Sequence, residues 1–484
     1  MLKTVLLRNQ SVTNFRYCHG YRTFRSFLST ATSAQPLKGQ IPLIINGKDV
    51  VTKASFPLVG PLKNEEVWTV SSASIQDAAD AANAAQSAFT SWSRTKPSYR
   101  RDIFLRAADV MAKRKDELGE YMRQEIGADE GYQQFILGLA IEGLKDTAGR
   151  IAGACAGSLP DSIHDGMRAM VQKRPYGVVL GIAPWNAPYH LGLRSITFPL
   201  AVGNTAILKG SELTPCCYWA IADVFREAGL PDGVLNFIVH RPADAVPVTN
   251  SLIAHPAVRK INFTGSSKVG AILAAEAGRH LKPTLMELGG KANAIVLKDA
   301  NLENAAKHCA DLFRETVDKM FGSVNTTPIL VNSGSARRNR SLIEDAKSKG
   351  AKSMDLFSEV IRTDVETHMR PVVLTNVDKT MDLYGGESFG PSVSLYAFET
   401  EDEVVALAND TDYGLTASVY SEDLKAAFRV ADRLDTGAVH INSMTVHDEF
   451  ALPHGGVKSS GFGRFNGYQG LEEFLYCKSV TWME

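Results

Sequence analysis

A carboxylate beside a pair of glycines is the first candidate catalytic group in this sequence. Glu287 lies in residues 286–291 (MELGGK), between apolar residues and a Gly-Gly turn. A buried carboxylate of this kind can act as a general base that takes a proton from water. The alternative is an ordinary cap or surface acid beside a turn.

An asparagine between two prolines is the second candidate. Residues 184–188 (PWNAP) place Asn186, preceded by Trp185, directly after a predicted strand. Its side-chain amide can donate a hydrogen bond to an oxygen that becomes negatively charged during a reaction. The alternative is an asparagine with no role beyond forming the turn between the two prolines.

A strand-to-helix junction could receive a phosphate. Residues 263–270 (FTGSSKVG) end a predicted strand and open a helix, which places Gly265 and Ser266 at the helix amino terminus and Gly270 one turn later. Free amide groups and the helix dipole attract phosphate there. Both the full G-x-G-x-x-G spacing and the P-loop ending are missing, so an ordinary turn is the alternative.

A lysine and a glutamate follow another predicted strand, earlier in the chain. Lys209 and Glu212 come after residues 205–208, at the edge where open parallel sheets bind ligands. The Glu212 carboxylate can accept hydrogen bonds from ribose hydroxyls and would repel a 2′-phosphate, which favours NAD over NADP. Solvated loop side chains are the alternative.

The elements that must position these groups indicate an α/β fold. Apolar residues at helical spacing predict helices after Ser74 and Pro97, and from Tyr176 short β-rich runs alternate with helical stretches. Such alternation is typical of parallel strands joined by crossover helices, here in two domains that meet near Glu287. Strands are predicted at residues 178–182, 205–208, 234–239, 260–263, 293–297, 329–331, 372–374, 393–398, 417–420 and 438–441, with helices at 400–409, 423–434 and from Ser341.

Composition restricts the partners. The 484 residues, 44% of them hydrophobic, can bury a large core, and a net charge of −1 argues against nucleic acid as a main partner. The sequence contains no run of eighteen uninterrupted apolar residues, so it does not predict a transmembrane helix. The six cysteines lack metal-binding spacing, which indicates reduced thiols and no metal site.

The amino-terminal segment has a targeting composition. Residues 1–34 contain Lys3 and four arginines among Ser, Thr, Leu and Phe, and the first acid is Asp49. This predicts a mitochondrial transit segment and a protein of the mitochondrial matrix, so residues 1–34 are left out of the predicted fold. The alternative is a disordered basic tail on a cytoplasmic protein.

Taken together, the motifs resemble those of aldehyde dehydrogenases. The shared motifs occur in the order residues 184–186, 209–212, 263–266, 287–291 and 387–391, and the resemblance spans about residues 41–480. Residues 446–449 (VHDE) and 455–458 (GGVK) are most similar to the branch that oxidises salicylaldehyde, benzaldehyde and vanillin.

The resemblance implies an aldehyde dehydrogenase fold of three parts. Residues 40–287 would form a Rossmann-like NAD-binding domain, and residues 288–466 an α/β catalytic domain. A hairpin at residues 157–173 and a tail at residues 467–484 would form an oligomerisation element for a homodimer or homotetramer.

The resemblance also implies NAD-dependent oxidation of a small, aromatic aldehyde to an acid. Glu287 would activate water and Asn186 would line the oxyanion hole. Lys209 and Glu212 would hold the adenine ribose. The implied cofactor-binding residues are Trp185, Lys209, Glu212, Gly265, Ser266, Gly270, Glu387 and Phe389.

One family motif is missing. The family attacks the aldehyde with a thiolate from an Asn-x-Gly-Gln-x-Cys turn, and no such turn lies between Glu287 and Val331. Cys309 lies on the apolar face of a predicted helix, which indicates a structural role. Ser323 has no identifiable base that could remove its hydroxyl proton. The stretch after Val331 is also shorter than in the family. Three hypotheses follow: an active enzyme, an inactive relative that binds dinucleotide or partner subunits, or a truncated gene product.

Overall fold

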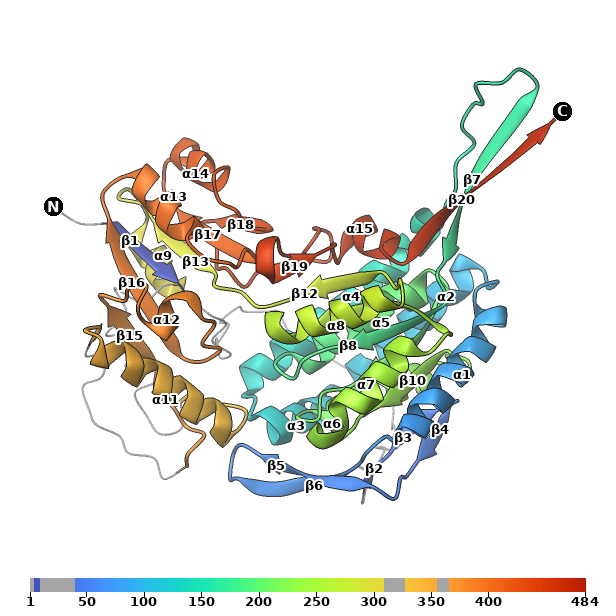
Figure 1. Ribbon diagram of the computed structural model, residues 1–484, viewed down its shortest axis with the longest axis horizontal. Helices are drawn as coiled ribbons and strands as arrows, with labels where there is room; N and C mark the ends of the chain where they lie inside the picture. Colours follow the sequence, from blue (N-terminus) through green and yellow to red (C-terminus); the bar gives the residue numbers. More distant parts are fainter. Residues whose placement is uncertain (1–3, 9–39, 309–326, 355–364) are drawn as a thin grey trace, which may run out of the picture.

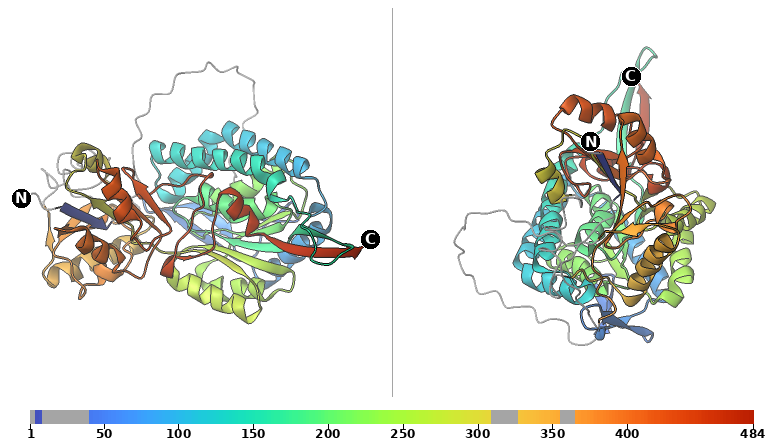
Figure 2. Two further views of the ribbon diagram at one scale, coloured as in Figure 1. Left: turned by 90° about the horizontal axis from the view of Figure 1, so that it is seen from above. Right: turned by 90° about the vertical axis from the view of Figure 1, so that its left-hand side faces the viewer.

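The computed structural model describes residues 4–8, 40–308, 327–354 and 365–484. Two lobes, each built on a β-sheet with helices on its faces, lie side by side (Figures 1 and 2). The expected α/β class is confirmed. Cys309, predicted to be structural, and Ser323, for which no base was identified, lie outside the described residues.

The larger lobe contains an eight-stranded sheet in the order β19-β12-β11-β8-β9-β10-β3-β4. The five strands from β12 to β10 run parallel, and apolar side chains bury β8 completely, as expected for a strand covered on both faces. The strands are β19 (Gly461–Phe462), β12 (Thr284–Glu287), β11 (Val258–Thr264), β8 (Val178–Ile182), β9 (Thr205–Lys209), β10 (Leu235–Ile238), β3 (Leu43–Ile45) and β4 (Lys48–Val50).

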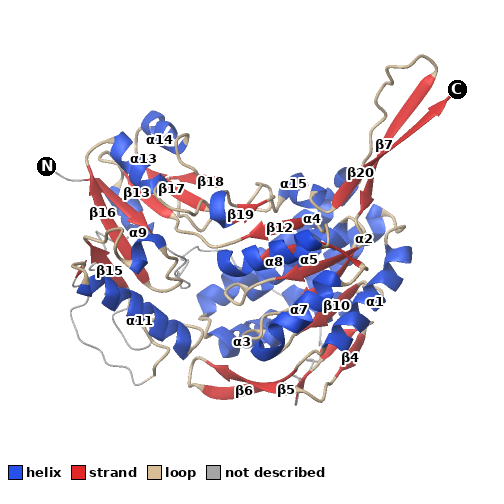
Figure 3. Ribbon diagram, viewed as in Figure 1, coloured by secondary structure: helices blue, strands red, loops and turns tan. Residues whose placement is uncertain are grey.

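Helices cover both faces of this sheet (Figure 3). Helix α1 begins where the sequence predicts, because Ser74 and Asp77 form a reciprocal capping box. Helix α5 is buried along its whole length, including its polar residues. The helices are α1 (Ile75–Trp92), α2 (Pro97–Lys113), α3 (Lys115–Ile126), α4 (Glu130–Ala154), α5 (Pro188–Ala201), α6 (Pro215–Glu227), η1 (Pro242–Asp244), α7 (Ala245–Ala254) and α8 (Ser267–Arg279).

The smaller lobe contains a seven-stranded sheet in the order β14-β15-β16-β1-β13-β17-β18. Its strands are β14 (Lys352–Ser353), β15 (Val372–Thr375), β16 (Ser392–Phe398), β1 (Thr4–Arg8), β13 (Asn293–Val296), β17 (Thr416–Tyr420) and β18 (Ala438–Ile441). Its helices are α9 (Leu302–His308), α11 (Ser333–Ser348), α12 (Asp382–Gly385), α13 (Glu401–Asn409) and α14 (Leu424–Ala431). Strand β1 comes from the segment that the sequence analysis left out of the fold.

Two small sheets complete the molecule. Strands β7 (Met167–Pro175) and β20 (Leu475–Met483) pair antiparallel and project from the larger lobe (Figure 1). A three-stranded sheet has the order β2-β6-β5. The remaining elements are β2 (Gln40–Ile41), β5 (Ser55–Gly60), β6 (Glu65–Ser71), η3 (Lys458–Ser460) and α15 (Gly467–Glu472).

Nine of the ten predicted strands are confirmed to within two residues at each end, and one is wrong. Residues 329–331 form no strand, since only Ile329 makes an isolated bridge, to His368. The helix expected from Ser341 instead begins at Ser333, because the Asn332 side chain accepts a hydrogen bond from the Ser335 amide and caps it. In the described residues, no helix is long and apolar enough to span a membrane.

Candidate active site

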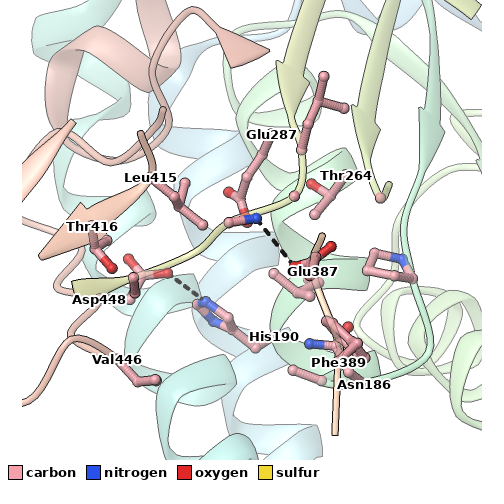
Figure 4. Close-up of a pocket in the computed structure, with 18 of the residues that line it drawn as sticks. Asn186, His190, Thr264, Glu287, Glu387, Phe389, Leu415, Thr416, Val446 and Asp448 are labelled. Atoms are coloured by element: carbon pink, nitrogen blue, oxygen red, sulfur yellow. Dashed lines mark hydrogen bonds and ion pairs between the residues drawn. The ribbon is translucent and has the colours of Figure 1, made fainter. Parts of the chain in front are cut away.

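A cavity of about 560 Å³ contains most of the predicted site residues. It is lined from α4, the β8–α5 turn, α5, the ends of β11 and β12, and the loop after β18 (Figure 4). The predicted residues that line it are Trp185, Asn186, Gly265, Ser266, Glu287, Glu387 and Phe389. Lys209, Glu212 and Gly270 do not line it.

Glu287 is the last residue of β12 and is 7% exposed. It is not the lone carboxylate that the sequence suggests, because its Oε2 is paired with the Nη2 of Arg194. The Nε2 of His454 lies 3.5 Å from the same oxygen. Both basic groups therefore approach one carboxylate oxygen, and the negative charge of Glu287 is compensated inside the protein.

Arg194 links Glu287 to a second carboxylate, Asp448. Its Nη1 lies 2.6 Å from Asp448 Oδ2, and the Nε2 of His190 lies 2.8 Å from the same oxygen (Figure 4). Burial alone would raise the pKa of Asp448, but the positive charges of His454, Arg194 and His190 outweigh it and hold this pKa well below its usual value. Asp448 is thus a fixed negative charge in the cavity wall.

The sequence analysis missed this buried ionic network. His190 and Arg194 lie four residues apart in α5, so they share one face of a helix that is otherwise almost entirely apolar. Two basic side chains four residues apart in the apolar run 188–201 are the signal in the sequence that indicates this network. Asp448 lies 254 residues from Arg194, and nothing in the sequence pairs the two.

Asn186 is held by its backbone as well as by the two flanking prolines. The Tyr132 hydroxyl of α4 donates a 2.8 Å hydrogen bond to the Asn186 carbonyl oxygen. This contact fixes the turn between β8 and α5. The side chain of Asn186 lines the cavity near Phe389 (Figure 4), so the expected donor position is available to a ligand.

Glu387 and Phe389 lie on the loop before β16. The Gly290 amide donates a 3.1 Å hydrogen bond to Glu387 Oε1, whereas burial raises the pKa of this carboxyl. The ring of Phe389 packs edge-on against Trp185, with 5.5 Å between centroids. Phe389 has a φ of 51°, a left-handed conformation that is uncommon for a large side chain. The loop is therefore held in a specific shape at the cavity.

The predicted phosphate turn has the expected local geometry. Ser266 caps α8 by accepting a hydrogen bond from the Val269 amide. Gly270 has another role, because an added Cβ would lie 2.3 Å from Leu288 Cδ2. It permits close packing of α8 against the segment after β12.

Lys209 and Glu212 lie at the carboxyl end of β9, as predicted, and both are half-buried. Burial lowers the pKa of Lys209, and the charge of Glu212 partly opposes this. Burial and then the charge of Lys209 lower the pKa of His240 to about 4. At this edge, a lysine and a glutamate therefore lie beside an imidazole that is neutral at pH 7.

None of the described cysteines lines the cavity. Cys216 and Cys217 are buried in α6, where burial and then the charge of Glu125 raise the pKa of both thiols well above its usual value. Such thiols remain protonated and are poor nucleophiles. Cys155 and Cys477 lie elsewhere on the larger lobe and its projecting strands.

The sequence profile of the Aldehyde dehydrogenase family matches residues 50–316 and 315–480. The chain belongs to the aldehyde dehydrogenase family of enzymes. A vanillin dehydrogenase of Pseudomonas sp. (strain HR199 / DSM 7063) is 38% identical over 476 positions, which cover 91% of this chain and 97% of the relative. The 91% corresponds to about 440 of the 484 residues. About 36 of the 476 aligned positions therefore have a residue in the vanillin dehydrogenase and a gap in this chain.

Solved aldehyde dehydrogenases have the same fold. A salicylaldehyde dehydrogenase from Pseudomonas putida G7, complexed with salicylaldehyde, superposes with a TM-score of 0.87 and 31% identity, and covers 92% of this chain and 99% of that chain. Betaine aldehyde dehydrogenase from Staphylococcus aureus in complex with NAD+ gives a TM-score of 0.84 and 28% identity, with 91% and 94% covered.

Proposed function

We propose that this chain oxidises an aromatic aldehyde to the carboxylic acid and uses NAD as the oxidant. The observation that carries the proposal is the single cavity that Asn186, Glu287 and Glu387 all line. It brings a hydrogen-bond donor for an oxyanion and a buried base together with a second carboxylate for a ribose. Membership of the aldehyde dehydrogenase family supports aldehyde oxidation.

The cavity wall supports an aromatic substrate. A volume of about 560 Å³ lies within the range of small-molecule sites and leaves room for one substituted benzene ring beside a cofactor end. Many large apolar side chains line it, among them Tyr132, Phe135, Ile136, Leu139, Leu191 and Val446. The relatives named for vanillin and salicylaldehyde support the same class of substrate.

We propose that Glu287 accepts the proton from the attacking water. Arg194 and His454 both approach Oε2, so we assign Oε1 to the water. The carboxylate form of Glu287 is the one that accepts a proton from water. Asn186 is assigned the aldehyde oxygen as it gains negative charge.

The residues present fit a dinucleotide. Lys209 and Glu212 would hold the adenine ribose, and Gly265 and Ser266 would receive the pyrophosphate at the amino terminus of α8. Glu387 would accept a hydrogen bond from the second ribose, with Phe389 and Trp185 beside the nicotinamide. Bound NAD supplies the hydride acceptor. Glu212 would repel a 2′-phosphate, so we expect NAD to bind more tightly than NADP.

A second function, binding without turnover, is favoured by one observation. Among the described residues, no cavity-lining side chain is a cysteine. The two remaining nucleophile candidates, Cys309 and Ser323, lie outside the described residues. An aldehyde dehydrogenase that binds dinucleotide or partner subunits without oxidising aldehydes would have this cavity and no thiol in it.

One experiment separates the two functions. Purified protein is mixed with benzaldehyde or salicylaldehyde and with NAD or NADP, and NADH or NADPH formation is followed by absorbance while cofactor binding is measured by calorimetry. NADH formation that exceeds NADPH formation supports the enzyme. NAD binding with no NADH supports the binding function, and absence of both contradicts the proposal. Cys309→Ala and Ser323→Ala then identify the nucleophile, because only its replacement abolishes turnover.

We also propose that the chain assembles as a homodimer or homotetramer through β7 and β20. An isolated pair of strands is at best marginally stable in water. This pair projects from the lobe and exposes Trp482 and Met483 at its end. Removing residues 475–484 is therefore expected to lower the mass measured by light scattering, and an unchanged mass would contradict the assignment.

The mitochondrial destination stays a prediction from residues 1–34. Its support is the acid-free, arginine-containing composition of that segment. A fluorescent protein fused after residue 40 of this chain is expected to enter mitochondria. Cytoplasmic fluorescence would favour the alternative.

A further inference from the structure

Strand β1 occupies an unusual place in the seven-stranded sheet. It pairs antiparallel with β13 on one side and with β16 on the other. Its neighbours otherwise belong to parallel series, in which β13 pairs with β17 and β16 pairs with β15. The sheet thus consists of the parallel series β13-β17-β18 and the parallel pair β15-β16, which has β14 antiparallel at its edge, and one strand from the far end of the chain joins them.

The order of elements indicates that this place normally belongs to another strand. Helix α9 follows β13, and a strand–helix unit of this kind leads by a right-handed crossover to a strand parallel to the first. Between α9 and α11, the described residues 327–332 contain only the isolated bridge from Ile329. The family match breaks at residues 315–316, and about 36 aligned positions of the vanillin dehydrogenase face gaps in this chain.

An empty place there would be costly. Strands β13 and β16 would face each other across two strand spacings, roughly 10 Å, which is too far for their backbones to hydrogen-bond. Both would present unpaired edges in the interior of a lobe. Ile295 of β13 and Phe398 of β16 belong to one apolar cluster, and Val296 and Leu395 to another, so a gap would open two cores to water.

We propose that the slot between β13 and β16 is a strand-binding site and that residues Thr4–Arg8 of the same chain are its occupant. The register places Leu6 opposite Ile295 and Tyr396. The occupant has three consecutive apolar residues, Val5, Leu6 and Leu7, as strands buried on both faces do. The segment therefore takes the place that the order of the described elements assigns to a strand after α9, and it belongs to the folded protein.

The proposed role of residues 4–8 as a strand and the removal of residues 1–34 as a transit segment exclude each other. A strand in the middle of a sheet is not available to a targeting receptor, and a chain cleaved after residue 34 has no β1. The inference does not depend on the proposed catalytic function. It concerns only how the smaller lobe is completed.

Hydrogen exchange of the full-length protein tests the proposal. Amides of residues 4–8 are expected to exchange at least about tenfold more slowly than those of an unstructured peptide, as amides of a paired strand do. The full-length variant Leu6→Pro loses a backbone donor in the middle of the strand. It should speed exchange in residues 293–296 and 392–398 and leave residues 178–182 of the other sheet unchanged.

Val12→Pro, outside β1, is the matched control and should leave every one of these rates as in the wild type. If Leu6→Pro does not fold, the wild-type rates for residues 4–8 still decide the question. Exchange at the rate of an unstructured peptide would overturn the proposal. Protection that appears only as protein concentration rises would also overturn it, because the occupant would then come from a second copy.

Discussion

Replacing Arg194 by leucine should destabilise the protein strongly. The side chain is 1% exposed and lies between two carboxylates, Glu287 and Asp448, whose side chains are 9% and 15% exposed. Leucine keeps most of the volume but leaves both negative charges without their shared cation. Removing one partner of a buried ion pair costs about 3–5 kcal/mol, so we expect a loss of at least that size in the free energy of unfolding.

Urea unfolding followed by tryptophan fluorescence measures this loss. Arg101→Leu is the matched control, because Arg101 and Asp102 also form a 2.8 Å ion pair but are 50% and 49% exposed. An exposed pair contributes at most about 1 kcal/mol. The triple variant with Glu287→Gln and Asp448→Asn should recover most of the stability. If Arg194→Leu unfolds within about 1 kcal/mol of the wild type, the ionic network does not hold the site together.

Two further predictions concern the same region. The native pKa of Asp448 is depressed, so its ionisation stabilises the fold above pH about 4, where unfolded Asp is also ionised, and this contribution disappears as the pH falls toward the native pKa. The difference in melting temperature between wild type and Asp448→Asn should thus be large at pH 7 and shrink below pH about 4, whereas a constant difference would contradict the assignment. In helix α8, Gly270→Ala should lower the melting temperature, because the new methyl group meets Leu288, while Gly278→Ala, which meets nothing within 4 Å, should raise it through higher helix propensity. Equal shifts for the two alanines would show that the contact with Leu288 is unimportant.

Local patterns predicted most of the scaffold. The β8 and β13 strands are short apolar runs bounded by turn residues, and their burial on both faces makes such runs unambiguous. The three residues 329–331 look similar, but within the described part of the chain only Ile329 makes a bridge, and the run pairs with no strand there. Strand identity therefore depended on partners that the sequence does not show.

Long-range pairing accounts for what the sequence analysis missed. Glu287 was found because a carboxylate between apolar residues and a Gly-Gly turn can act as a buried base, but its partner Arg194 lies 93 residues away and was not singled out. Strand β1 was missed for a similar reason. Its register partners lie almost 300 or 400 residues away, and its composition indicated targeting.

Glu287 as the base of an aldehyde oxidation is the central claim, and the rate of NADH formation by Glu287→Gln tests it most directly. Glutamine keeps the shape of the side chain but cannot accept a proton from water. The account predicts a loss of about 100-fold or more with benzaldehyde, with NAD affinity unchanged, because general-base catalysis contributes about 10²–10⁴-fold. A variant that forms NADH at the wild-type rate would contradict it.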